Sequence, residues 1–70
     1  MEFEVRLDED DRWQVRLDGR VVSRHVTQQL AISHAKAKAL PRRGRVTWKD
    51  LAGHDQGLVD YSVRRAQRPS

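Results

Sequence analysis

The side chains that could carry catalytic chemistry in this chain of 70 residues are its three histidines, His25, His34 and His54. None of them has a partner at the i+4 spacing of a helix or the i+2 spacing of a strand, and a metal site needs several convergent ligands. The chain has no cysteine, which excludes a thiolate ligand and a disulfide. No motif surrounds a serine or threonine nucleophile, and no glycine-rich loop could hold a phosphate. We therefore expect no enzymatic activity, no metal and no cofactor.

Charge is distributed unevenly along the chain. Residues 1–11 hold six acids and one arginine, whereas residues 12–70 hold thirteen Lys or Arg and four acids. The two parts therefore carry net charges of −5 and +9, which sum to the formal net charge of +4. A basic body of this kind indicates docking on a polyanion or on an acidic protein face.

The densest basic segment is residues 41–45, where three arginines surround Gly44. Arginines in this arrangement can lie along a phosphate backbone or enter a narrow minor groove. The alternative is a solvated turn whose arginines favour the negative end of a preceding helix. If the tail and the following strand extend the same patch, one positive surface contacts nucleic acid, and its residues are Arg42, Arg43, Arg45, Lys49, Arg64 and Arg65.

These features favour a small binding domain without enzymatic activity. The first hypothesis is sequence-tolerant binding of DNA or RNA through the basic surface. The alternative is a protein-interaction module. Its partner would be a host protein, if a phage encodes the chain, or a cognate protein, and the acidic N-terminal residues would form the docking edge. The chain has neither the apolar run of a membrane span nor the pattern of a signal peptide, so we expect a cytoplasmic protein with no membrane contact. We also expect a monomer or a weak homodimer.

Two segments that must position these side chains alternate apolar and polar residues, over residues 3–7 and 13–17. Such alternation is the pattern of half-buried strands. The acidic residues 8–11 between them predict a solvated turn, and the two strands are therefore expected to form an antiparallel hairpin.

The dipeptide Asp18–Gly19 predicts a two-residue type I′ turn, in which both residues adopt positive φ. A third strand over residues 20–26 is expected to follow it. This turn would place Val22 in the core and Arg24 opposite Trp13, within reach of a cation–π contact.

A helix is expected over residues 27–40, with Thr27 as its N-cap and Pro41 ending it. Lys36 and Lys38 are expected to face outward near the negative end of the helix dipole. The predicted buried stripe consists of small or apolar residues at helical spacing, namely Ala31, Ile32, Ala35 and Ala39.

Two more strands are expected over residues 44–49 and 58–63, separated by a long polar loop over residues 50–57. The predicted fold is α+β: an antiparallel sheet of about five strands in the order β-β-β-α-β-β, with one helix packed on one face. We expect one domain over residues 1–65 and a frayed basic tail over residues 66–70.

The predicted core unites the inward positions of all these elements: Phe3, Val5, Leu7, Trp13, Val15, Leu17, Val22, Ala31, Ile32, Ala35, Ala39, Val46, Trp48, Val59, Tyr61 and Val63. The other face of the sheet is expected to be polar and mostly basic, with Arg12, Gln14, Arg16, Val21, Ser23, His25, Arg45, Thr47 and Lys49. Because both tryptophans and Tyr61 fall at core positions, that face lacks the aromatic platform on which single-stranded RNA stacks.

Three parts of the sequence together resemble a known family: Trp13-x-Val15, the Asp18-Gly19 turn, and Thr27-Gln28-x-x-Ala31-Ile32-x-x-Ala35-x-x-x-Ala39 before a hairpin. They are similar to the small bacterial and phage domains grouped as domain of unknown function 2188, over roughly residues 12–65. The resemblance implies a small α+β domain from a bacterium or its phage, and it implies no activity because the family has no established chemistry. The family usually has a tight Asp-Gly turn where this chain has residues 50–57, which leaves the register of the last hairpin open.

Overall fold

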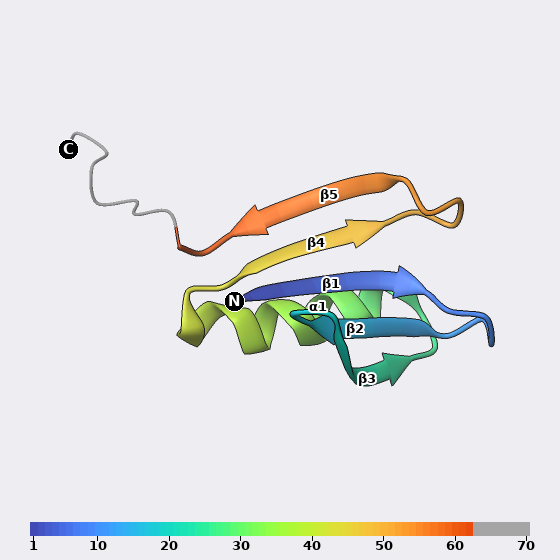
Figure 1. Cartoon of the computed structure of the whole chain (residues 1–70), viewed down its shortest axis with the longest axis horizontal. Helices are drawn as coiled ribbons and strands as arrows, with labels where there is room; N and C mark the ends of the chain where they lie inside the picture. The colour runs from blue at the N-terminus through green and yellow to red at the C-terminus, as the bar shows by residue number, and fades with distance from the viewer. Residues whose placement is uncertain (63–70) are drawn as a thin grey trace.

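Five strands form one sheet, and a single helix covers one face of it (Figure 1). The computed structural model describes residues 1–62. In chain order the elements are β1 (Glu2–Leu7), β2 (Trp13–Leu17), β3 (Arg20–His25), α1 (Gln28–Ala39), the short 3₁₀ helix η1 (Leu40–Arg42), β4 (Arg45–Lys49) and β5 (Asp55–Asp60). The predicted α+β class and the order β-β-β-α-β-β are confirmed.

The sheet is mixed, so the expectation of an antiparallel sheet is wrong. The strand order is β3-β2-β1-β4-β5, and β1 and β4 run parallel while the other neighbouring pairs are antiparallel. After β3, α1 carries the chain back along the sheet, so that β4 starts beside the start of β1, with Arg45 opposite Glu2. A helical crossover is the usual link to a parallel neighbour, and alternating residues do not report strand direction.

The turn between β1 and β2 is organised by the carboxylate of Asp8. Asp8 Oδ1 accepts hydrogen bonds from the backbone N–H of Asp10 at 2.8 Å and of Arg12 at 3.0 Å. These bonds lower the pKa of Asp8, with the bond from Arg12 making the largest contribution. The acidic run is thus a hairpin turn, as predicted.

The turn at Asp18 and Gly19 has the positive φ values that the sequence predicts, 50° and 89°. A β-bulge between Val15 and Arg16 then shifts the register of β3, so that Val15 pairs with Ser23. The prediction of Val22 in the core is therefore wrong, because the bulge leaves this side chain 42% exposed.

The same bulge corrects the expected contact between Arg24 and Trp13. Arg24 pairs with Gln14 and therefore lies on the uncovered face of the sheet, whereas His25 is the residue opposite Trp13. Among the described residues, a cation–π contact instead joins Lys36 to Trp48, with Nζ 5.2 Å from the ring centroid. Lys36 is thus half-buried and does not face outward as expected.

The helix begins where the sequence predicts. Thr27 is the N-cap, and its Oγ1 accepts a hydrogen bond from the backbone N–H of Leu30 at 3.2 Å. Pro41 ends α1, but the chain continues through η1 and ends in the left-handed conformation of Arg43, with φ of 54°. The predicted stripe of Ala31, Ile32, Ala35 and Ala39 is buried, and small side chains there let α1 pack closely against the sheet.

The core lies between α1 and the sheet, and most of the predicted core residues are in it. The buried apolar side chains are Phe3, Val5, Trp13, Val15, Ala31, Ile32, Ala35, Ala39 and Val46, against which Leu7, Leu17, Trp48, Val59 and Tyr61 pack partly buried. Tyr61 follows the end of β5 in a turn, and Val63 lies outside the described residues.

The last hairpin has a shorter turn than predicted. β5 begins at Asp55, so only residues 50–54 form the loop. Asp50 organises this loop, because its carboxylate accepts hydrogen bonds from the backbone N–H groups of Ala52 and His54, both at 2.9 Å. A bulge between Trp48 and Lys49 sets the register, which places Trp48 opposite Gly57.

Candidate nucleic-acid interface

The longest stretch of the chain without an acidic residue is the segment between Asp18 and Asp50, which includes α1. Between Asp18 and Asp50 the chain carries eight Lys or Arg and no Asp or Glu. Three of these cations, Lys38, Arg42 and Arg43, are exposed at the C-terminal end of α1 and on η1, and we call them the helix-end cluster. No ion pair joins this cluster to a carboxylate of residues 1–62.

The helix end itself holds part of this cluster in place. Arg42 Nη1 donates a hydrogen bond to the carbonyl oxygen of Lys38 at 2.9 Å, which satisfies one of the carbonyl groups left free where α1 ends. This is the contact expected of an arginine in a helix-ending turn. A guanidinium has five N–H donors, so Arg42 keeps donors for a phosphate while one of them binds the helix.

The other two predicted site residues in the described chain are ion-paired across the sheet. Arg45 Nη2 lies 3.2 Å from Glu2 Oε2, and Lys49 Nζ lies 3.7 Å from Glu4 Oε2. Both acids belong to β1, whose parallel pairing with β4 places each of them near a cation. The acidic N-terminal strand therefore offsets the positive charge of β4.

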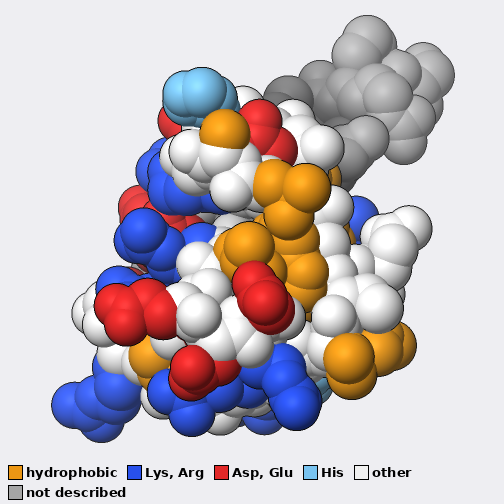
Figure 2. Space-filling model, turned by 90° about the vertical axis from the view of Figure 1, so that its right-hand side faces the viewer, with side chains coloured by type: hydrophobic (Ala, Val, Ile, Leu, Met, Phe, Trp, Pro, Cys, Tyr) orange, Lys and Arg blue, Asp and Glu red, His pale blue; other side chains and the backbone are white. Residues whose placement is uncertain are grey.

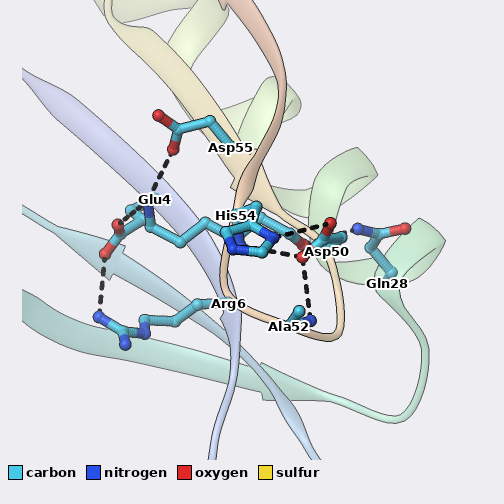
Figure 3. Close-up of polar contacts among 8 residues, drawn as sticks. Glu4, Arg6, Gln28, Asp50, Ala52, His54 and Asp55 are labelled. Carbon is cyan, nitrogen blue, oxygen red and sulfur yellow. Dashed lines mark hydrogen bonds and ion pairs between the residues drawn. The ribbon is translucent and has the colours of Figure 1, made fainter.

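Lys49 has a second carboxylate partner, Asp55, at 2.7 Å. This hydrogen bond raises the pKa of Lys49, and the same contact lowers the pKa of Asp55. Figure 3 shows Glu4 between Arg6 and the side of β5 that carries Asp55, so that cations and carboxylates alternate across three strands. Such alternation leaves little net charge for a polyanion.

The structure brings together only part of the predicted basic surface. Arg42, Arg43 and Arg45 lie at one end of the sheet, whereas Lys49 ends β4 at the other. Arg43 and Arg45 also line a small hollow of about 170 Å³ together with acidic side chains, Glu2 and Asp60. Arg64 and Arg65 lie outside the described residues.

The uncovered face of the sheet holds arginines that the predicted site omits. Arg6, Arg16 and Arg24 line an open hollow of about 580 Å³ beside the β1–β2 turn, together with Asp8, Glu9 and Asp10. Arg16 Nε donates to Gln14 Oε1 at 3.0 Å, and Arg24 Nε lies 3.4 Å from Asp8 Oδ2. The hollow thus has as many acids as arginines. Its position follows from the pairing of β1, β2 and β3, which periodicity alone does not predict.

Side chains of both signs cover this face. The left-hand side of Figure 2 shows Lys and Arg interleaved with Asp and Glu, so the expectation of a mostly basic face does not hold. Ser23 and His25 were expected on this face, but the bulge places them on the helix side. Trp13 packs in the core and Trp48 is partly buried against it, as predicted.

The three histidines are less scattered than their spacing suggests. His25 on β3 and His34 on α1 are in contact, with ring centroids 4.8 Å apart, and His25 Nε2 lies 3.0 Å from Ser23 Oγ. Burial lowers the pKa of His34, and His25 and Lys38 lower it further. No group of three His, Cys, Asp or Glu within residues 1–62 converges as metal ligands, and no helix in this range is long and apolar enough to span a bilayer.

A family model described as an uncharacterized protein conserved in bacteria, DUF2188, matches residues 3–57. No curated protein and no solved structure matches the chain. The matched residues run from the first strand to the middle of β5 and include the whole of α1.

Proposed function

The chain belongs to the uncharacterised bacterial family DUF2188, and we propose that it is a non-enzymatic domain that binds nucleic acid through the helix-end cluster. Binding is to backbone phosphates and tolerates different sequences. We include the tail residues Arg64 and Arg65 in the proposed binding surface. The last described residues lie close to the helix-end cluster, because the N–H of Tyr61 donates a hydrogen bond to the carbonyl oxygen of Gly44 at 2.9 Å.

The observation that carries this proposal is the difference between paired and unpaired cations. Arg45 and Lys49 are within ion-pair distance of acids, whereas Lys38, Arg42 and Arg43 have no such partner among the described residues. A cation without a carboxylate partner gains more from a phosphate, because it does not exchange one anion for another. Arginine can also bind a phosphate with two parallel N–H groups.

The chemistry of the cluster favours phosphates over base edges. Its members are long side chains at the end of a helix, and cations of this kind position a protein on the backbone without reading sequence. Both tryptophans pack toward the helix side of the sheet, so they provide no stacking surface for unpaired bases on the uncovered face. We therefore expect comparable affinity for unrelated sequences.

The test is fluorescence anisotropy with short duplex DNA, duplex RNA and single strands at several salt concentrations. Replacing Lys38, Arg42 and Arg43 with Gln removes the cluster, and replacing Arg6, Arg12 and Arg16 with Gln removes the same charge from the other end of the sheet. We expect the cluster variant to flatten the plot of log K against log salt by about 2 to 3, as the loss of two or three phosphate contacts requires. An equal change in both variants, or in neither, would contradict the proposal.

The second candidate is a protein-interaction module. It is supported by exposed apolar side chains near the start of α1, where Val26 is 66% and Leu30 53% exposed. Absence of salt-dependent binding to every nucleic acid, together with a discrete partner retained by the wild-type domain and lost by Leu30→Lys, would favour this candidate.

A further inference from the structure

Both edge strands of the sheet, β3 and β5, lack a neighbour on one side within the described chain. Each edge exposes apolar side chains: Val21 is 37% and Val22 42% exposed on β3, and Leu58 is 59% exposed on β5. An open edge presents backbone N–H and C=O groups that can pair with another strand. The two edges together therefore offer a way for copies of the chain to meet.

The two edges carry opposite charges. β3 has two arginines, Arg20 and Arg24, and no acid, whereas β5 has two acids, Asp55 and Asp60, and no Lys or Arg. Pairing of β3 with β3, or of β5 with β5, sets like charges against each other across the new strand pair, which is unfavourable. Pairing of β3 with β5 sets arginines against carboxylates.

The strand directions also suit this pairing. β3 runs with β1, and β5 runs against it, because β4 is parallel to β1 and antiparallel to β5. A second copy that continues the sheet therefore joins β3 to β5 as antiparallel strands, and each of these strands has six residues. Antiparallel pairing is slightly more stable per residue than parallel pairing.

The register within the sheet places one pair of opposite charges at the same height. Arg24 lies beside Gln14, and Gln14 lies beside Arg6. On the other side of β1, Val5 pairs with Trp48, so the next residues, Arg6 and Lys49, lie at the same height. Lys49 in turn lies beside Asp55. Arg24 and Asp55 therefore end the same row on the uncovered face. At the other end of the strands, Arg20 lies in the row of Phe3 on the helix side, whereas Asp60 lies in the row of Glu2 on the uncovered face. These two charges therefore do not oppose each other, and the charge match rests on Arg24 and Asp55.

We propose that copies of this chain associate head to tail, with β3 of one copy pairing with β5 of the next. Arg24 and Asp55 each have a partner in their own copy, Asp8 and Lys49. Their side chains nevertheless remain 59% and 85% exposed, so a second copy can share these charged groups. Such a contact joins two different surfaces, so it produces open chains or rings and not a symmetric dimer. The inference is independent of the proposed binding of nucleic acid.

Sedimentation velocity at increasing protein concentration tests the association, in low and high salt and without nucleic acid. We expect the average mass of the wild-type chain to rise with concentration and to fall with salt, which screens exposed charges. A monomer at every concentration would overturn the proposal, and so would a dimer that does not grow further.

A charge exchange tests the pairing of the two edges. Arg24→Glu and Asp55→Arg should each reduce self-association, whereas an equimolar mixture of the two variants restores it, because each new edge then meets an opposite charge. Glu9→Arg in the β1–β2 turn is the control and should associate at least as strongly as the wild type. If far-UV circular dichroism shows that a reversal variant is misfolded, Arg24→Gln and Asp55→Asn replace the pair, and each should weaken association. Failure of the mixture of folded reversal variants to recover, or unchanged association of folded Arg24→Gln and Asp55→Asn, would overturn the proposal.

Discussion

Gly57 on β5 lies directly beneath the indole ring of Trp48 on β4, and the two residues are paired across the strands. A β-carbon at Gly57 would overlap the Cε2, Cζ2 and Nε1 atoms of that ring. The ammonium of Lys36 lies over the same indole. The absence of a side chain at Gly57 is therefore what lets an aromatic residue cover β5, whose backbone α1 does not approach.

We predict that Gly57→Ala destabilises the domain by about 1–3 kcal/mol, because the indole must leave its rotamer or the strands must separate. Urea unfolding followed by circular dichroism measures this loss. Leu58→Ala, at the exposed neighbouring position, is the matched control and should change stability by much less. The loss should also shrink in a Trp48→Leu background, and an equal loss in both backgrounds would show that the indole is not its cause.

The cap of α1 gives a second prediction. Thr27→Ala removes the hydroxyl that accepts the N–H of Leu30 and should cost about 1 kcal/mol of unfolding free energy. Thr27→Ser keeps the hydroxyl and should retain most of the stability. A similar loss in both variants would mean that the methyl group of Thr27, and not the cap, is what stabilises the helix.

The partial burial of His34 beside His25 makes stability depend on pH. Burial lowers the pKa of His34 below its ordinary value of 6.5, and the neighbouring His25 and Lys38 lower it further. The unfolded chain therefore binds a proton at His34 at a higher pH than the folded domain does. Where the unfolded state holds more protons, stability rises with pH. We predict that this contribution is intact well above pH 6.5, falls as the pH decreases through 6.5, and stops falling below the lowered pKa of the folded state.

Unfolding free energies measured between about pH 5 and pH 8 test this dependence. His34→Gln should flatten the curve in this range, because its side chain does not titrate. His54→Gln is the control, since His54 is exposed in the β4–β5 turn, and it should leave the dependence in place. If His34→Gln keeps the slope of the wild type, another group is responsible.

The residue pattern predicted most of the secondary structure because alternation and caps are local features. The first four strands, the Thr27 cap and the alanine stripe of α1 lie where expected, whereas β5 begins three residues earlier than predicted. The direction of β4 relative to β1 was not predictable in this way, since a parallel and an antiparallel strand have the same alternation. The bulge at Val15 and Arg16 also has no periodic signal, and it alone moved Val22 out of the core.

The candidate site was predictable only in composition. The sequence identifies Arg45 and Lys49 as cations near Arg42 and Arg43, but their partners Glu2 and Glu4 come from the other end of the chain. That pairing depends on the parallel contact of β1 with β4. The helix-end cluster stands apart because its neighbours in the sequence include no acid.

The ion pairs of β1 allow a last prediction that separates the two basic surfaces. Glu2→Gln together with Glu4→Gln releases Arg45 and Arg6, while Lys49 keeps its closer partner Asp55. Glu9→Gln with Asp10→Asn removes the same charge from a turn where neither acid has an ion-pair partner among the described residues. If nucleic acid binds the helix-end cluster, both variants should raise affinity modestly through the general field of the protein, with the salt dependence unchanged. A slope steeper by about 0.9 for each released cation in the first variant alone would instead place the phosphates on the uncovered face of the sheet.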